Sequence, residues 1–555
     1  RIGKPGAAPF SITGQPNAMG GREVGGLAST LAAHMDFAEE HRADLQRFWA
    51  SPRMAAKPGL KAVDLFRSMG EGRIKAVWIM ATNPAVSLPD AGTVREALAK
   101  CPFVVVSDCI AETDTSHFAH AKLPAAGWGE KDGTVTNSER VISRQRALFP
   151  PAGEARPDWW IISQVARAMG WRDAFCFDRP ADIYREHARL STYRNGGRRL
   201  FDLGCHGGIS NRDYDAMEPF RWGGRPFADG CFPTADGKAR MVSVQQRDFE
   251  KPLSKWPLTL NTGRYRDQWH TMTRSGLSPR LSQHRREPLV DIHPADAVPA
   301  NIADGDLVVV ETPQGESVFR ATFNDGQRRG EIFVPIHWTD RQSSGGRAGI
   351  LPAPLVDPHS GQPGFKSTPA RLGPLAAAWK GFFISRCEPE SIPAVYFAKV
   401  RVAGGWLTEL AGTGDPAQVA RRLMPEGERV EITDSARGAS RIAVLEHGRL
   451  AAALFTSQRD GLPDREWLIS QLEEARAAPA IELLAGRPAA PRPDRGAIVC
   501  VCYDIGMKTI VDAIVNQALT SVDEVGRALS AGTNCGSCRP AIQRLIGASK
   551  EAAHG

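Results

Sequence analysis

The sequence predicts an α/β protein with four successive folded parts: a parallel-sheet domain, a β-barrel, a small α/β module and a small helical domain. Three observations lead to this prediction. Buried strand patterns alternate with a helical pattern in residues 74–140, five short strands bounded by turn residues follow in 258–336, and four cysteines accompany helical segments from residue 500 on. A length of 555 residues leaves room for about four domains.

The composition is that of a globular protein. Hydrophobic residues make up 42% of the chain and charged residues 24%, which excludes a disordered chain, a collagen-like fibre and a coiled coil. No uninterrupted apolar run approaches the roughly 18 residues that a membrane span needs, so an integral membrane protein is excluded. The net charge of +7 is small for this length and does not by itself indicate a nucleic acid partner.

The first part contains a β-α-β unit. Residues Ile74–Met80 and Phe103–Ser107 have the composition of buried strands, and Asp90 can cap a helix that ends near Lys100. Parallel strands bind ligands beyond their carboxyl ends, and a polar loop follows each strand here. The loops contain Thr82, Asn83, Pro84 and Ser87 after the first strand, and Asp108, Thr113 and Thr115 after the second. Such residues are also common in turns, but their occurrence at adjacent strand ends favours a binding site.

A β-barrel is predicted next. Its expected strands are 258–261, 289–292, 307–311, 317–321 and 332–336, separated by turn residues such as Gly305-Asp306 and Gln314-Gly315. Between the two sheets, residues 158–169 predict a helix, and residues 180–255, with many Gly, Arg and Asp, predict an irregular region.

A basic segment, residues 262–286, follows the first barrel strand. It contains six arginines, at positions 264, 266, 274, 280, 285 and 286, against the single acid Asp267, and also His270 and His284. Two interpretations remain open. The segment is either a solvated basic loop, or a cradle for pyrophosphate in which Thr262, Gly263 and Arg264 supply free amides and a guanidinium.

After about residue 375 the sequence predicts a small α/β module, 376–480. A hairpin turn is expected at Glu446-His447-Gly448-Arg449 and a helix from Asp464. The next residues, 481–496, are a predicted linker, because Arg487–Asp494 holds three prolines in eight residues. Such a linker suits a mobile C-terminal module, 497–547.

The C-terminal module contains two cysteine pairs. Cys500 and Cys502 form a C-x-C pair, and Cys535 and Cys538 form a C-x-x-C pair after 32 intervening residues, with helical patterns at 507–514, 522–529 and 540–546. Two such pairs can supply a tetrathiolate site for an iron–sulfur cluster or zinc, and two disulfides are the remaining alternative. The six other cysteines are scattered, as thiols in a reducing compartment usually are.

The pattern C-x-C…A-G-T-x-C-G-x-C resembles the bacterioferritin-associated-ferredoxin-like [2Fe-2S] module. The cluster ligands of that family correspond to Cys500, Cys502, Cys535 and Cys538 without a gap. The resemblance therefore implies a [2Fe-2S] cluster and a role in electron transfer.

Further strings lie in the first two parts. They are Gly14–Gly25 (GQPNAMGGREVG), Asn83-Pro84, Asp108 with Thr113, Leu123-Pro124, Glu130, Gly133-Thr134, Asn137, Glu139-Arg140, Thr262-Gly263-Arg264, Trp269-His270-Thr271-Met272-Thr273, Asp357-Pro358, Gln362-Pro363 and Phe365-Lys366. In combination they resemble the molybdopterin-guanine-dinucleotide oxidoreductases, and among these the bacterial assimilatory nitrate reductases. The resemblance covers residues 1–375. It implies a molybdopterin-binding α/β domain at 1–255, incomplete at its N-terminus, and a dinucleotide-binding barrel at 256–375.

The resemblance also implies an activity: reduction of nitrate to nitrite in nitrate assimilation, at a molybdenum held by two molybdopterin guanine dinucleotides. It points to Arg22 as the residue that binds the substrate, because a guanidinium can bind a planar oxyanion at two places. A surface arginine or a salt bridge with Glu23 is the alternative.

Cofactor contacts are expected at the family positions. Asp108 is expected to accept hydrogen bonds from guanine, and Asn83 and Asn137 to contact pterin or phosphate. His270 is expected beside the pyrophosphate, or as a buried imidazole bonded within the protein. The other matching positions are Pro84, Thr113, Thr262, Gly263, Arg264, Thr271 and Thr273.

Two features of the family are missing. The family implies an N-terminal [4Fe-4S] cluster domain and an upstream Cys that ligates the metal, but no cluster-spaced Cys set precedes Cys101, and the sequence begins at Arg1 without Met. We therefore expect that this sequence is an N-terminally truncated part of a longer enzyme. Processing of a precursor is the alternative. We also expect this chain alone to be inactive.

Electrons are expected to arrive at the C-terminal cluster from a flavoprotein NADH-dependent reductase subunit, a ferredoxin or a flavodoxin, in the cytoplasm. Neither nucleic acid nor a membrane is an expected partner. Two other functions are considered: a formate dehydrogenase of the same superfamily, and a non-catalytic truncated product that only transfers electrons.

Overall fold

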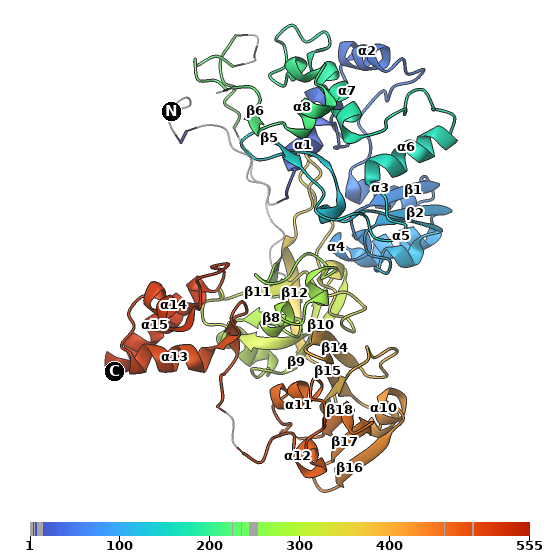
Figure 1. Cartoon of the computed structure of the whole chain (residues 1–555). Helices are drawn as coiled ribbons and strands as arrows, with labels where there is room; N and C mark the ends of the chain where they lie inside the picture. Colours follow the sequence, from blue (N-terminus) through green and yellow to red (C-terminus); the bar gives the residue numbers. More distant parts are fainter. Residues whose placement is uncertain are drawn as a thin grey trace.

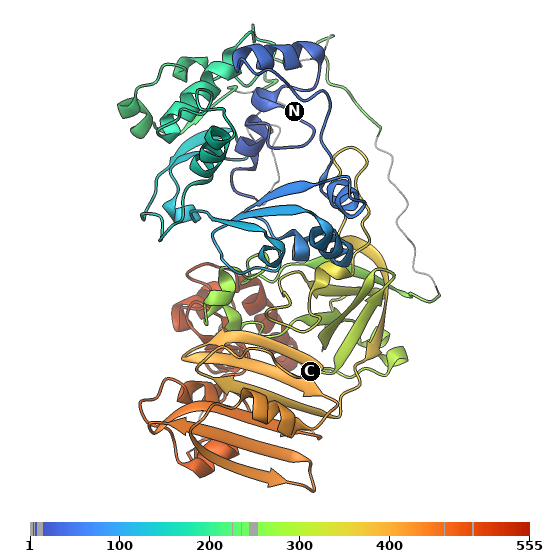
Figure 2. The ribbon, with the colours of Figure 1, turned by 90° about the vertical axis from the view of Figure 1, so that its right-hand side faces the viewer.

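A computed structural model of the chain describes residues 4, 6–7, 15–224, 226–232, 234, 236–243, 254–459, 461–490 and 493–554 (Figure 1). Gly14 of the first motif, residues 244–253 of the predicted irregular region and residues 491–492 of the predicted linker lie outside the described residues. The N-terminal parallel sheet, the barrel and a six-stranded sheet follow one another along the long axis, and the C-terminal helices lie beside the barrel (Figures 1 and 2).

The N-terminal sheet is parallel, as predicted. Its three strands pair in the order β1-β2-β3, with Met80 opposite Ser107 and Asp108 opposite Pro124, so their carboxyl ends meet at one edge. Asp90 occupies the predicted capping position, but its backbone is left-handed (φ 50°) and its side chain makes no capping hydrogen bond. The elements are α1 Ala18–Glu23, α2 Glu39–Phe48, α3 Ala62–Gly70, β1 Ala76–Met80, α4 Pro84–Ser87, α5 Ala91–Lys100, β2 Phe103–Asp108 and β3 Ala121–Pro124.

An antiparallel sheet and three helices extend this part. They are β4 Gly133–Thr136, β5 Val141–Gln145, α6 Asp158–Ala168, α7 Pro180–Thr192, α8 Asn211–Asp215 and β6 Phe220–Arg221. The predicted helix at 158–169 is present. The prediction of an irregular region from 180 is wrong for its first part, because α7 begins there with Pro180 in its first turn. Ala181, Tyr184 and Ala188 are buried at helical spacing on α7.

The barrel is closed by six strands in the order β10-β8-β11-β7-β12-β9. All five predicted strands are present. The sixth, β12, was not predicted because it contains Pro369 and Pro374; the register shift between Lys366 and Thr368 shows that its pairing is irregular. The strands are β7 Leu258–Gly263, β8 Leu289–Ile292, β9 Leu307–Thr312, β10 Gly315–Phe323, β11 Glu331–Pro335 and β12 Lys366–Pro374.

The module after the barrel is an antiparallel sheet in the order β14-β15-β13-β18-β17-β16, packed against three short helices. The predicted hairpin turn joins β17 to β18, and α11 begins two residues after Asp464. Helix α12 occupies the start of the predicted linker, because Leu483 is buried in the module core. The elements are β13 Trp379–Ser385, β14 Tyr396–Val402, β15 Gly405–Gly412, α10 Pro416–Leu423, β16 Glu428–Asp434, β17 Ala439–Glu446, β18 Arg449–Ser457, α11 Glu466–Gln471 and α12 Ala480–Ala485.

The C-terminal module has three helices where the sequence predicts them. They pack around Ile510, Val525 and Ile542, in contact with Cys500 and Cys538. The elements are β19 Ile498–Cys500, β20 Ile505–Gly506, α13 Met507–Asn516, α14 Val522–Leu529 and α15 Arg539–His554. Among the helices of the described residues, none combines the length and the apolar character needed to cross a bilayer.

Candidate functional site

Asn83, at the start of α4, connects the parallel sheet to the barrel. Its amide nitrogen donates to Thr271 Oγ1 at 3.2 Å, and its oxygen accepts from the backbone N–H (3.1 Å) and the hydroxyl (2.6 Å) of Thr115. All three side chains are buried. The structure therefore brings together two predicted site residues that are 188 positions apart, Asn83 and Thr271. Pro84 follows Asn83 in the first turn of α4 and is buried as well.

The loop after β2 is held by its own side chains. Asp108 Oδ1 accepts from the backbone N–H of Ile110 at 3.1 Å, and Thr113 Oγ1 accepts from the backbone N–H of Ser116 at 3.1 Å. These bonds are the turn chemistry that the sequence offers as an alternative. They also fix the loop so that Asp108 faces a cavity.

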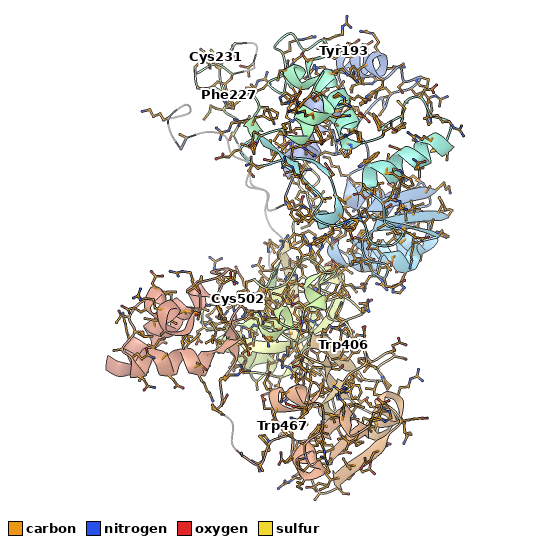
Figure 3. The ribbon with its side chains drawn as sticks, viewed as in Figure 1. Tyr193, Phe227, Cys231, Trp406, Trp467 and Cys502 are labelled. Atoms are coloured by element: carbon orange, nitrogen blue, oxygen red, sulfur yellow. The ribbon has the colours of Figure 1, made fainter. Side chains whose placement is uncertain are left out.

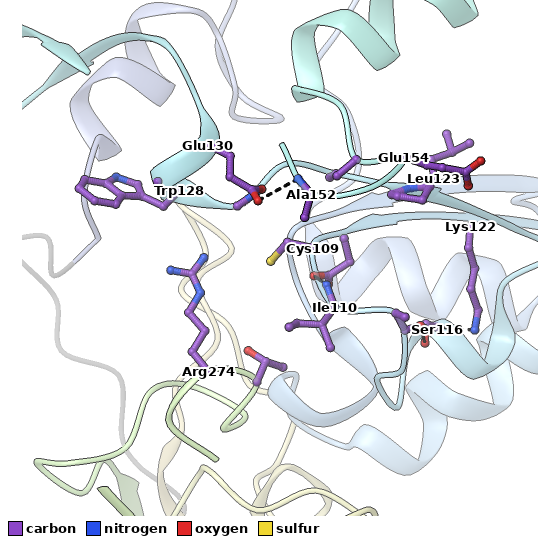
Figure 4. Close-up of a pocket in the computed structure, with 18 of the residues that line it drawn as sticks. Cys109, Ile110, Ser116, Lys122, Leu123, Trp128, Glu130, Ala152, Glu154 and Arg274 are labelled. Atoms are coloured by element: carbon purple, nitrogen blue, oxygen red, sulfur yellow. Dashed lines mark hydrogen bonds between the residues drawn. The ribbon is translucent and has the colours of Figure 1, made fainter. Parts of the chain in front are cut away.

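This cavity has a volume of about 800 Å³ and lies between the loop after β2 and the basic segment of the barrel (Figure 4). Its lining includes Asp108, Trp128, Glu130, Phe149 and Arg274. Glu130 also accepts from the backbone N–H of Ala152 at 3.1 Å, which fixes one wall. The size is in the range of small-molecule and cofactor sites, and apolar walls with a few charged groups are typical of them.

A second cavity of about 440 Å³ adjoins the first, since Thr273 and Ile110 line both. Asn83, Thr113 and Thr271 contribute to it. Five of the eleven predicted cofactor residues therefore line these cavities: Asp108 lines the first, Asn83, Thr113 and Thr271 line the second, and Thr273 lines both.

The barrel residues Thr262 and Gly263 lie at the end of β7. The Thr262 hydroxyl donates to Phe365 O at 3.0 Å, and a Cβ added at Gly263 would lie 2.6 Å from the Phe333 ring, so a larger residue there would displace this ring. The next residue, Arg264, is exposed. Contacts within the barrel therefore account for Thr262 and Gly263, and a contact of either residue with a cofactor stays a prediction.

His270 is held by a second histidine, His337, which the sequence did not single out. His337 is fully buried; its Nδ1 lies 2.6 Å from His270 O, and its Nε2 accepts from the backbone N–H of Tyr265 at 2.8 Å. Burial lowers the pKa of His337 to about 4, so the ring is neutral near pH 7. His337 therefore joins the two ends of the loop from Tyr265 to His270 through hydrogen bonds to their backbone.

Arg22 and Asn137 lie apart from the linings of the two cavities. Arg22 is exposed on α1, while its neighbour Glu23 is buried and accepts from the Thr136 hydroxyl (2.8 Å) and the Trp222 indole N–H (2.7 Å). Burial raises the pKa of Glu23, against the effect of these two hydrogen bonds. The side-chain oxygen of Asn137 accepts from the backbone N–H of Val141 at 3.0 Å, in the turn between β4 and β5.

The four C-terminal cysteines are brought together. Cys502 Sγ lies 3.4 Å from Cys535 Sγ, which is too far for a disulfide, and Cys500 and Cys538 are both buried in the core of the module. A hydrogen bond with the Ser537 hydroxyl is the main cause that lowers the pKa of Cys535, which favours the thiolate form.

Within the described residues, no three His, Cys, Asp or Glu side chains gather as the ligands of one metal ion. The cysteines instead approach in pairs, 502 with 535 and 500 with 538. Two thiolates for each of two irons is the ligation of a [2Fe-2S] cluster, so the set fits this cluster better than a single zinc ion.

The basic segment is not a free solvated loop. Arg266 Nη2 donates to Val499 O at 2.5 Å and Arg280 Nη1 to Cys502 O at 3.4 Å, both in the C-terminal module. Arg286 forms an ion pair with Glu466 of α11 at 2.6 Å. The C-terminal module, which the sequence suggests is mobile, is thus docked on the barrel in this structure. Figure 3 shows Cys502 where the two meet.

Comparison with known proteins gives three family matches. Residues 1–168 match the molybdopterin oxidoreductase family, residues 258–369 match the molydopterin dinucleotide binding domain, and residues 498–548 match the BFD-like [2Fe-2S] binding domain. The cysteine pairs and the lining of the larger cavity fall within these matches.

Similar proteins include a nitrate reductase of Klebsiella oxytoca, 44% identical over 99% of this chain and 64% of the relative. The assimilatory nitrate reductase catalytic subunit of Bacillus subtilis is 32% identical over 68% of this chain and 53% of the relative. The subunit alpha of an F420-dependent formate dehydrogenase of Methanocaldococcus jannaschii is 31% identical over 61% of this chain and 49% of the relative. The chain thus spans less than two thirds of the length of these relatives.

Proposed function

We propose that this chain, which belongs to the molybdopterin oxidoreductase family and carries a BFD-like [2Fe-2S] domain, is part of an enzyme that reduces nitrate to nitrite in nitrate assimilation. The observation that carries the proposal is the succession of molybdopterin, dinucleotide-binding and [2Fe-2S] domains in a chain that aligns over 99% of its length with a nitrate reductase. We infer domain divisions at 1–255, 256–375, 376–480, the linker 481–496 and 497–547, and the start of this linker, up to Ala485, is the helix α12 that packs on the module before it.

The reaction takes one nitrate, two electrons and two protons to one nitrite and one water. Side chains cannot accept an oxygen atom and give up two electrons together, and molybdenum held by the pterin cofactor would supply this capacity. In the present structure, the larger cavity would hold part of the dinucleotide. Asp108 would accept hydrogen bonds from guanine, and Arg274 on the opposite wall would face an anionic group of the cofactor.

Arg22 is proposed to bind nitrate. Its guanidinium is exposed, and among the described residues no carboxylate pairs with it, since both oxygens of Glu23 are bound elsewhere. The tight backbone of this segment supports a fixed position: a Cβ at Gly25 (φ +76°) would lie 2.5 Å from Ala32 N, so glycine is required there. A guanidinium can bind two oxygens of a planar anion.

A substitution tests this role. In the full-length enzyme, Arg22→Ala is expected to raise the KM for nitrate by about 10- to 100-fold, the loss of a charge-assisted hydrogen-bonded pair worth about 1.5–3 kcal/mol. Molybdenum content should not change, and Arg22→Lys should restore part of the affinity. Steady-state kinetics with a reduced dye as donor measures this. A KM equal to that of the unaltered enzyme would remove Arg22 from the substrate site.

The electron donor is proposed to be a flavoprotein NADH-dependent reductase subunit, a ferredoxin or a flavodoxin, and the compartment the cytoplasm. The support is that Cys535 is exposed, so one side of the cluster site is open to a partner, and that all ten cysteines are free.

Formate oxidation is the second candidate, because the formate dehydrogenase relative is 31% identical. The 44% identity over nearly the whole chain favours nitrate. A non-catalytic electron-transfer product would hold iron in its C-terminal module but would neither reduce nitrate nor oxidise formate.

A further inference from the structure

The contact between the barrel and the C-terminal module is made at the cluster-binding turn itself. Arg266 and Arg280 both donate to backbone carbonyls of this turn, Arg266 to Val499 and Arg280 to Cys502. Val499 precedes the first cysteine of the C-x-C pair, and Cys502 is the second. The two arginines therefore bracket the turn that would supply two of the four cluster ligands.

The Arg266 side chain is held in position by Asp267, which His284 contacts in turn. Its Nε donates to Asp267 Oδ2 at 3.0 Å, and His284 Nδ1 lies 3.0 Å from the same oxygen. The Asp267 side chain is only 9% exposed and that of Arg266 21%. A planar guanidinium held at one edge presents its other edge in a fixed direction, so little side-chain freedom is lost when it binds Val499.

The chain between the two parts would otherwise let the module move. Helix α12 ends at Ala485, and the module begins with β19 at Ile498. A proline-rich stretch of this kind, residues 487–495, can span about 30 Å at roughly 3.1 Å per residue. The tether alone therefore does not determine which face of the module meets the barrel.

The same segment also reaches the large cavity. Thr273 and Arg274 line it, between Arg266 and Arg280 in sequence. Residues 262–286 thus contact the cluster-binding turn at two points and the proposed pterin site between them. Positive charge next to a cluster favours its reduced form, which carries one more negative charge than the oxidised form.

We propose that Arg266 and Arg280 form a clamp that docks the [2Fe-2S] module on the dinucleotide-binding barrel with its C-x-C turn inward, and that raises the reduction potential of the cluster. They are positioning residues. The proposal rests on the proposed function in one respect: a [2Fe-2S] cluster held by these cysteines would pass on, one at a time, the two electrons that each nitrate needs.

The test compares Arg266→Gln/Arg280→Gln with a matched control, Arg285→Gln, in the full-length, cluster-loaded protein. Arg285 belongs to the same segment, but its charge acts on Asp291 and Tyr265 of the barrel. Two properties are measured: the midpoint potential of the [2Fe-2S] EPR signal in a redox titration, and the radius of gyration from small-angle X-ray scattering. In the double variant we expect a lower midpoint potential and a larger radius of gyration, with the control equal to the unaltered protein.

The clamp is refuted if the double variant keeps both values, or if the control shifts as much as the double variant. If the double variant loses its iron, the single variant Arg280→Gln tests the clamp. Arg280 is exposed and makes the longer of the two hydrogen bonds, so its substitution disturbs the fold of the module least. It should show a smaller shift in the same directions, and no shift would refute the clamp. Neither measurement uses nitrate, so failure of the clamp and failure of the nitrate proposal are distinguished.

Discussion

At the scale of single residues, His337 makes the stability of the barrel depend on pH. It joins the backbone at Tyr265 to that at His270 and has no contact with solvent. Burial is the main reason that its pKa falls from 6.5 to about 4, and the positive charge of Arg264 adds to the effect. Protonation would place a second N–H on the ring, opposite the N–H of Tyr265.

The sign of the effect follows from the lowered pKa. Well above pH 6.5 both the folded and unfolded states hold a neutral His337, and its contribution to stability is complete. As the pH falls from 6.5 toward 4, only the unfolded state binds the proton, so stability is lost. At pH 5 the loss is about 2 kcal/mol.

We predict that His337→Gln lowers the thermal unfolding midpoint at pH 7 and makes it depend less on pH between 7 and 5. Thermal unfolding followed at several pH values measures both. His187 also has a pKa of about 4, but it is present in both proteins and cancels in the difference. If the variant and the unaltered protein show parallel pH profiles, His337 is not the titrating group.

Individual site residues were predictable to different degrees. Asn83, Asp108 and Thr113 stand at strand ends, and the sequence pattern places them at one sheet edge. His337 was not predicted, because its partners Tyr265 and His270 lie about 70 positions earlier and meet it only through the parallel pairing of β11 with β7. A salt bridge between Arg22 and Glu23 was the alternative to a substrate role for Arg22. In the structure Glu23 is buried and accepts from the Trp222 indole instead, a partner 199 positions away that no local pattern reveals.

At the scale of elements, the parallel sheet meets the barrel through α4 and the short helix at 348–350. Gly349 lies so close that an added Cβ would stand 2.0 Å from Val86 O. Two hydrogen bonds strengthen the contact: Asp90 N–H to Pro352 O at 3.1 Å, and Arg347 to Ala85 O at 3.4 Å. The contact fixes how the two cavity walls face one another.

We predict that Gly349→Ala lowers the free energy of unfolding by about 1–3 kcal/mol, because a backbone carbonyl cannot give way as a flexible side chain can. Thermal unfolding and the molybdenum content of the purified full-length protein measure the effect, and both should fall. Gly373→Ala on β12 is the control, because an added Cβ there meets nothing within 4 Å. Equal values for both variants would contradict the importance of this contact.

The elements that the sequence missed share a physical reason. β12 contains two prolines, and only its pairing with β7 and β9, 60 to 112 residues away, makes it a strand. Helix α7 lies in a region whose overall composition is rich in Gly and Arg, but its own apolar positions have helical spacing. Local patterns were therefore sufficient for β1, β2 and the five regular barrel strands, whereas composition averaged over 75 residues concealed α7.

At the scale of the whole molecule, residues 262–286 join parts that are distant in sequence. Arg266 and Arg280 contact the C-terminal module, Arg286 contacts α11, and Arg274 faces the large cavity. From the sequence, the charge of this segment, a possible pyrophosphate cradle and its resemblance to a dinucleotide-binding segment were visible, but not its contacts with the C-terminal module and α11. Its partners are backbone carbonyls and a carboxylate more than 150 positions away, which no local pattern reveals.

The central claim is that electrons held by this protein's clusters are delivered to nitrate. The most direct measurement is to reduce the full-length, metal-loaded protein with dithionite in the absence of oxygen, remove the excess, and add nitrate while recording the visible absorbance. We predict that the cluster absorbance returns and that one nitrite forms for every two electrons released. Absorbance that stays bleached with nitrate, together with bleaching of the oxidised protein by formate, would contradict the account.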